Sequence, residues 1–188
     1  ALIYMAEGNF DEAKKNIEIA IDQAPDQPIF QSNYGALLHS MGNHQEAVVA
    51  FEKSIKLDDK LFQSYYSLGI VYSDLNQHEK AVEAYHKALD VNNKSAAAHN
   101  NLANLFSNNN NPEAEYHYKK LVELEPTQVY PRLNMANYYI KRDQFNEAIS
   151  SLNELVDMGI ATKEVFNSLG VSYKGLNDTK NAILMFEE

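Results

Sequence analysis

A repeat of 34 residues runs through this chain and limits what it can fold into. An alanine recurs with successive steps of 34, 34, 33, 34 and 34 residues, at Ala13, Ala47, Ala81, Ala114, Ala148 and Ala182. Periods of about 20 to 50 residues are typical of arrays in which each unit packs only on its neighbours. The chain is therefore expected to be a row of similar units with one continuous core.

Three further columns of residues keep the same period. A small column reads Ala1, Gly35, Gly69, Ala103, Ala136 and Gly170. Two large, mostly aromatic columns read Tyr4, Leu38, Tyr72, Phe106, Tyr139 and Tyr173, and then Ile17, Phe51, Tyr85, Tyr118, Leu152 and Phe186. Within a unit these residues recur at helical spacing. Each unit is therefore predicted to be two antiparallel helices of about 13 residues, in contact at the small columns and filled by the large ones.

Turn-forming residues separate the predicted helices. Gly8-Asn9 and Gly42-Asn43 are typical of turns between helices. Asn111-Pro112 indicates an N-cap followed by proline at the first helical position. That turn is one residue shorter than its equivalents, which accounts for the single 33-residue step.

Composition and motifs argue against several function classes. The 188 residues carry 16 Lys and Arg against 26 Asp and Glu, a net charge of −10, which argues against a nucleic-acid partner. Cysteine is absent, and no apolar run is long enough for membrane insertion. We expect an intracellular, cytoplasmic protein without catalytic residues, metal or cofactor. The six histidines show no metal-ligand spacing and are predicted to be solvated or to lie in turns.

The pattern resembles the tetratricopeptide repeat family. The segment SYYSLGIVYSDLNQHEKAVEAYHKAL, which begins at Ser64, carries the family's order of small and aromatic residues most fully. The resemblance implies an all-α, right-handed solenoid with first helices on the concave face and second helices on the convex face. We expect one array with complete repeats at 28–61, 62–95, 96–128 and 129–162, and partial repeats at 1–27 and 163–188. The array is expected to be part of a longer chain.

One column of short polar residues lies on the predicted concave face, two positions before the small column. It reads Asn33, Ser67, Asn101, Asn134 and Ser168. A carboxamide offers one acceptor and two donors, which match the N–H and C=O of a peptide unit. The column resembles the asparagine ladder in the arrays of O-linked N-acetylglucosamine transferases. By that resemblance Asn33, Asn101 and Asn134 would hold the backbone of an extended peptide.

The predicted groove contains further residues, and alternatives remain open. It is completed by Asn100, Asn104, Asn137, Asn167, Tyr66 and Tyr130. The leading prediction is a non-enzymatic module that binds a peptide segment of a partner protein. In the alternative for the asparagines, their amides bond neighbouring helices or water. The chain could also be a scaffold that uses its convex face or associates through its repeat ends, or the substrate-recruiting domain of a larger enzyme such as a glycosyltransferase.

Overall fold

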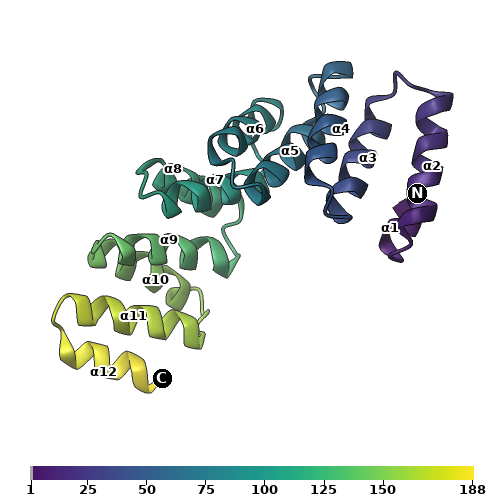
Figure 1. Ribbon diagram of the computed structural model, residues 1–188. Helices are drawn as coiled ribbons and strands as arrows, with labels where there is room; N and C mark the ends of the chain where they lie inside the picture. The colour runs from purple at the N-terminus through teal and green to yellow at the C-terminus, as the bar shows by residue number, and fades with distance from the viewer. Residues whose placement is uncertain (1) are drawn as a thin grey trace. The chain divides into compact units, whose positions relative to one another are not determined.

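The computed structural model describes residues 2–188, apart from the side chains of Leu2 and Met5, and every regular element in this range is a helix (Figure 1). Ala1, the first member of the small column, lies outside the described residues. The helices are α1 (Leu2–Ala6), α2 (Phe10–Gln23), α3 (Pro28–Ser40), α4 (His44–Leu57), α5 (Phe62–Asp74), α6 (His78–Val91), α7 (Ala96–Asn108), α8 (Glu113–Leu124), α9 (Val129–Lys141), α10 (Phe145–Asp157), α11 (Lys163–Gly175) and α12 (Thr179–Glu187). The predicted all-α fold is confirmed.

The chain forms two compact units, one up to Ala98 and the other from His99 to Glu188. In the first unit successive helices pack on one another from α1 to α6, and α3 also contacts α5. In the second unit the same holds from α8 to α12, and α9 also contacts α11. Each unit is thus a run of helical hairpins in which one first helix lies against the next (Figure 1).

The alanine column belongs to the core, and all six of its members are buried. The small column makes room for rings from the same hairpin. A methyl group added at Gly35 would lie 2.9 Å from the ring of Phe51, and one added at Gly69 would lie 2.6 Å from the ring of Tyr85. The large columns are core residues as predicted, except Tyr173, which is half-buried, and Tyr4 and Phe186, which are exposed. The two exposed residues belong to the outermost helices, α1 and α12, where a neighbouring helix covers one side only.

The same turn closes every first helix. A residue with positive φ follows each of them: Gly8, Gly42, Asn76, Asn110, Asp143 and Asn177. The backbone N–H of the next residue then donates to the carbonyl five residues earlier, for example from Gln77 to Tyr72 at 2.8 Å and from Gln144 to Tyr139 at 2.9 Å. This is the hydrogen bond of a Schellman motif, which satisfies a free carbonyl at the helix end.

The turn before α8 differs from the expectation. The helix begins at Glu113, so Pro112 precedes it and is not its first residue. Asn111 still caps this end, because its side-chain oxygen accepts a hydrogen bond from the N–H of Glu113 at 3.0 Å. The prediction of a shorter turn is wrong: residues 109–112 form a turn of four residues where the equivalent turns have three, and the helix is shortened at its start instead.

Tyrosine–glutamate hydrogen bonds connect successive hairpins. The hydroxyl of Tyr72 on α5 donates to Glu52 on α4 at 3.1 Å, and that of Tyr139 on α9 donates to Glu115 on α8 at 3.0 Å. Burial, together with Glu52, raises the pKa of Tyr72 to about 12. Burial and the bond to Glu115 likewise raise the pKa of Tyr139. Both hydroxyls therefore stay protonated donors at neutral pH.

A buried serine takes the place of an alanine that the family pattern favours in the second helix. Ser54 donates a hydrogen bond of 2.7 Å to the carbonyl of Pro28 and lies 2.8 Å from the hydroxyl of Ser64. All three residues belong to the first unit, where these contacts connect α4 to α3 and α5.

Among the described helices, none has the length and apolar character needed to cross a bilayer.

Candidate functional site

Two first helices, one in each unit, present an apolar side chain and an amide one turn apart. On α3, Ile29 is 42% exposed and Asn33 is half-buried. On α9, Tyr130 is 73% exposed and Asn134 is half-buried. Neither amide forms a side-chain hydrogen bond within the part of the chain that the structure describes. Asn33 and Asn134 therefore keep their full hydrogen-bonding capacity for a ligand.

The first unit engages its other two predicted groove residues internally. Ser67 accepts a hydrogen bond of 2.9 Å from the side-chain amide of Gln63, one turn earlier on α5. The half-buried ring of Tyr66 stacks on Phe62 with centroids 5.6 Å apart and tilts against Tyr85 at 5.9 Å. Ser67 and Tyr66 would have to give up or share these contacts to bind a ligand.

In the second unit some of the predicted amides hold neighbouring helices together. The oxygen of Asn104 accepts a hydrogen bond of 2.9 Å from the hydroxyl of Tyr118 on α8. The oxygen of Asn137 on α9 lies 3.5 Å from the donating hydroxyl of Ser168, which is buried on α11. Asn101 is half-buried and has an interaction partner. These contacts match the alternative in which groove amides bond their neighbours.

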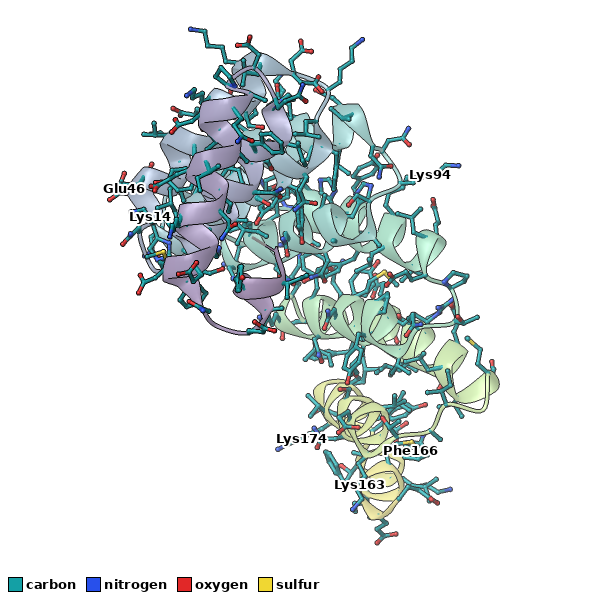
Figure 2. All side chains as sticks on the ribbon, turned by 90° about the vertical axis from the view of Figure 1, so that its right-hand side faces the viewer. Lys14, Glu46, Lys94, Lys163, Phe166 and Lys174 are labelled. Carbon is teal, nitrogen blue, oxygen red and sulfur yellow. The ribbon has the colours of Figure 1, made fainter. Side chains whose placement is uncertain are left out.

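Asn100 and Asn167 are the remaining predicted amides. Asn100 is half-buried on α7 and forms no side-chain hydrogen bond with the residues that the structure covers. Asn167 is exposed on α11 and lines a hollow of about 300 Å³ together with Lys163, Phe166 and Phe186. Two of these residues, Lys163 and Phe166, are labelled in Figure 2. Asn167 therefore lies beside α12, which is the second helix of its own hairpin.

Two histidines lie where the sequence did not predict them. His99 on α7 and His117 on α8 are buried, and their Nδ1 atoms are 2.9 Å apart. The prediction that the histidines are solvated or in turns is therefore wrong for this pair. Their positions are set by the packing of one helix on the other, which the periodicity of the chain does not reveal.

A second histidine cluster lies at the ends of three helices in the first unit. His39 Nε2 on α3 is 2.6 Å from Asp74 Oδ2 on α5, and the ring of His44 on α4 lies 5.3 Å from the ring of His39. Spacing rules missed this cluster because His39 and Asp74 are 35 residues apart. A comparison of each residue with the residue 35 positions later, one more than the repeat length, would have found it.

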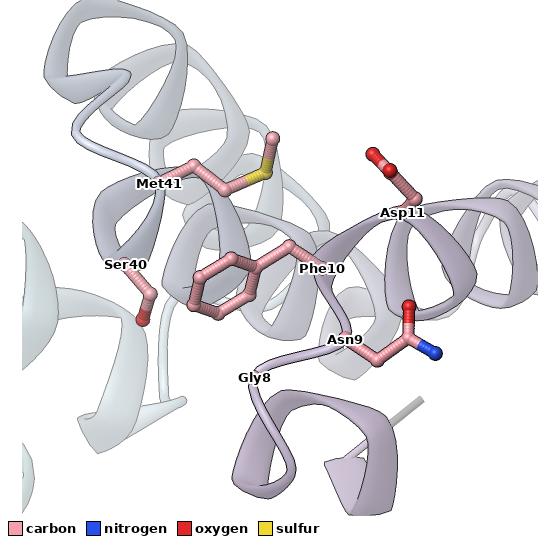
Figure 3. A pocket seen from close by; sticks show the side chains of 6 residues that line it. All are labelled: Gly8, Asn9, Phe10, Asp11, Ser40 and Met41. Carbon is pink, nitrogen blue, oxygen red and sulfur yellow. The ribbon is translucent and has the colours of Figure 1, made fainter.

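The larger hollows lie away from the predicted groove. One of about 410 Å³ is lined by Gly8, Asn9, Phe10, Asp11, Ser40 and Met41, which come from α2, from the end of α3 and from the turns beside them (Figure 3). Another of about 360 Å³ is lined from α4, α5 and α6 by Glu52, Tyr65, Leu68, Tyr72, Lys80, Glu83, Ala84 and Lys87. None of these residues belongs to the predicted peptide-binding set.

Comparisons with known proteins agree with the hairpin architecture. Three family models, each described as tetratricopeptide repeat, match residues 1–27, 26–94 and 66–129. No curated protein sequence matches the chain.

Solved structures share the fold. The chain is similar to YrrB, described as a TPR protein with an unusual peptide-binding site, at 21% identity and a TM-score of 0.79 over 93% of this chain and 91% of that one. It is also similar to MamA at 18% identity and a TM-score of 0.78 over 87% and 90% of the two chains. For PilF of Pseudomonas aeruginosa the identity is 16% and the TM-score 0.76, over 98% and 84%.

Proposed function

Since this chain belongs to the tetratricopeptide repeat family, we propose that it is a non-enzymatic interaction module that binds extended peptide segments of a partner protein along its first helices. The observation that carries the proposal is the arrangement of Ile29 with Asn33, and of Tyr130 with Asn134. In both pairs an exposed apolar side chain stands one turn before an amide without an internal partner.

The chemistry of these pairs suits a peptide backbone. An amide can accept from a backbone N–H and donate to a backbone C=O, whatever the peptide's sequence. The neighbouring isoleucine or tyrosine can cover an apolar side chain of the same peptide, and tyrosine is a frequent anchor in protein interfaces.

The charge of the first helices supports a near-neutral ligand. Helices α3 and α7 contain no Asp, Glu, Lys or Arg, and α5 contains only Asp74. On α9, Arg132 is buried and donates to Glu154 on α10 at 3.0 Å, so it faces the second helix. Lys141 on α9 and Lys163, Glu164 and Lys174 on α11 are further charges on first helices. A charged peptide would therefore find few partners on α3, α5 and α7, whereas backbone amides and apolar side chains would find several.

The peptide-binding site named in the description of YrrB supports the same class of function. That protein shares the fold over most of both chains. Identity of 21% does not transfer particular residues, so the candidates here remain the residues of this chain: Asn33, Asn134 and Tyr130, followed by Asn100, Asn101 and Ser67.

The experiment is a fluorescence-anisotropy screen of extended peptides against the wild type and the variants Asn33→Ala and Asn134→Ala. Loss of one amide–backbone hydrogen bond should weaken binding by about 1 kcal/mol, or roughly fivefold. The matched control is Asn153→Ala, because Asn153 is an exposed asparagine on the second helix α10. A peptide that contacts only one unit will be sensitive to only one of the two variants. Unchanged affinity in both variants contradicts the proposal.

The hollow between α4, α5 and α6 favours one alternative, a scaffold that uses the second-helix side. It combines two tyrosine rings, Tyr65 and Tyr72, with Lys80 and Lys87. A partner bound there should be weakened by Lys87→Glu and unaffected by Asn33→Ala or Asn134→Ala. The same two sets of variants, tested on one partner, therefore distinguish a groove ligand from a scaffold contact.

A further inference from the structure

Three metal-ligating side chains converge at one edge of the first unit. His39 lies in the last turn of α3, His44 is the first residue of α4, and Asp74 is the last residue of α5. Each histidine offers one ring nitrogen and Asp74 offers one carboxylate oxygen. These three atoms all lie within 4.8 Å of one another. We propose that these three residues bind a divalent transition-metal ion, for which zinc is the natural probe.

The ligand set fits this ion. Imidazole nitrogen and carboxylate oxygen bind zinc at about 2.0 to 2.2 Å, which places the ligand atoms of a tetrahedral site about 3.3 Å apart. The distance from His39 Nε2 to Asp74 Oδ2 is 2.6 Å, and no pair of ligand atoms exceeds 4.8 Å. Small side-chain rotations therefore suffice to reach the tetrahedral spacing. The incoming ion takes the place of the hydrogen bond between His39 and Asp74.

The cluster is accessible to an ion from solvent. The side chain of His39 is 29% exposed and that of Asp74 is 46% exposed. Three protein ligands leave a fourth position for water or for a group supplied by a partner. An ion held here connects α3, α4 and α5, which are three successive helices in mutual contact.

The repeat itself does not produce this arrangement. One period later, the residues equivalent to His39, His44 and Asp74 are Ser73, His78 and Asn108, so only the middle ligand recurs. In both His44 and His78, the Nδ1 atom is buried and has no hydrogen-bond partner in the described part of the chain. That feature belongs to the helix start in both repeats. What distinguishes His44 is the presence of His39 and Asp74 beside it, and His78 is therefore an internal control.

The test is a titration of the untagged, chelator-treated protein with zinc chloride in a calorimeter. A parallel titration with cobalt chloride uses the visible absorption of four-coordinate cobalt as a signature of the ligand geometry. The wild type and His78→Ala should bind one zinc ion with equal affinity. His39→Ala, His44→Ala and Asp74→Asn should each weaken binding at least about tenfold, with circular dichroism showing that the variants remain helical.

Two results overturn the proposal. In the first, the wild type binds no zinc, and the contact between His39 and Asp74 is then a hydrogen bond only. In the second, zinc binding is unchanged in any one of the three ligand variants, or falls equally in His78→Ala. Because these readouts use no peptide, failure of the metal site leaves the peptide-binding proposal unaffected, and the reverse also holds.

Discussion

The close contact between Gly69 and Tyr85 allows a quantitative prediction about packing. Glycine inside a helix costs roughly 0.5 to 1 kcal/mol relative to alanine, so propensity alone predicts that Gly69→Ala stabilises the protein. The added methyl group would lie 2.6 Å from the nearest ring carbon of Tyr85. Carbon atoms prefer about 3.5 to 4 Å, so the ring would have to move by nearly 1 Å.

Tyr85 has little room for that movement, because its side chain is buried and lies against Tyr66. Overpacking of a filled core costs about 1 to 3 kcal/mol. Subtracting the gain in helix propensity leaves about 0 to 2.5 kcal/mol, and we expect Gly69→Ala to lower the free energy of unfolding by about 1 kcal/mol. The assay is urea denaturation followed by circular dichroism, compared at the transition of the first unit, since repeat arrays can lose cooperativity between units.

The chain provides its own control for this contact. One repeat later the equivalent pair is Ala103 with Tyr118, where the second helix starts one residue later after its turn. Two repeats later it is Ala136 with Leu152, in which a methyl group and a smaller side chain coexist in the core. In a Tyr85→Leu background, Gly69→Ala should therefore become neutral or stabilising. A double-mutant cycle should give a coupling energy of about 1 to 2 kcal/mol. An equal effect of Gly69→Ala in both backgrounds, or a stabilised single variant, would refute the steric explanation.

Three further predictions follow from buried polar groups. The pKa of Tyr72 is raised from 10.0 to about 12, so the folded state favours the protonated hydroxyl. The contribution of this hydroxyl to the free energy of unfolding is therefore complete below pH 10 and disappears as the pH rises towards 12. Urea midpoints measured across that range should fall more steeply for the wild type than for Tyr72→Phe. Ser54→Ala should lower the free energy of unfolding, measured by urea denaturation, by about 1 to 3 kcal/mol, although it restores the family's usual alanine. Adding Ser64→Ala to this variant should lower the free energy of unfolding little further. Arg132→Met should lower the free energy of unfolding by about 1.5 to 3 kcal/mol, because Arg132 is buried and donates two hydrogen bonds. Glu154→Gln should lower it less, because Glu154 is the more exposed partner, and thermal unfolding compares the two variants.

The sequence was sufficient to predict the helices and their core because the contacts of a helical hairpin are local and recur in every repeat. The small residue at Gly35 and the ring at Phe51, for example, follow from spacing alone. The site depends on contacts that spacing does not contain. Whether an asparagine such as Asn104 bonds its neighbour or remains available, as Asn33 does, is decided by the side chain opposite it. That opposite residue varies from repeat to repeat.

Clusters between successive repeats were the other feature that the sequence concealed. His39 and Asp74 meet because α3 contacts α5, and the residues are one position out of phase with the 34-residue period. The buried pair of His99 and His117 lies within one hairpin, and it depends on the facing surfaces of that hairpin's two helices. A search for chemistry in a repeat chain should therefore compare each residue with its neighbours at one period and at one period plus or minus one.

The hydrogen bond that closes each first helix comes from the turn that leads into the next helix, and in five hairpins from the residue directly before that helix. Gln77, for example, donates to the carbonyl of Tyr72, while its own carbonyl accepts the first hydrogen bond of α6 from Ala81. Fraying of one helix therefore loosens the start of the other, and the hairpin opens as a single unit. In hydrogen-exchange terms, the amides of Asn9, Asn43, Gln77, Asn111, Gln144 and Asp178 become one reporter for each hairpin. A ligand that holds only the first helices should slow exchange at these turns, although it touches none of them.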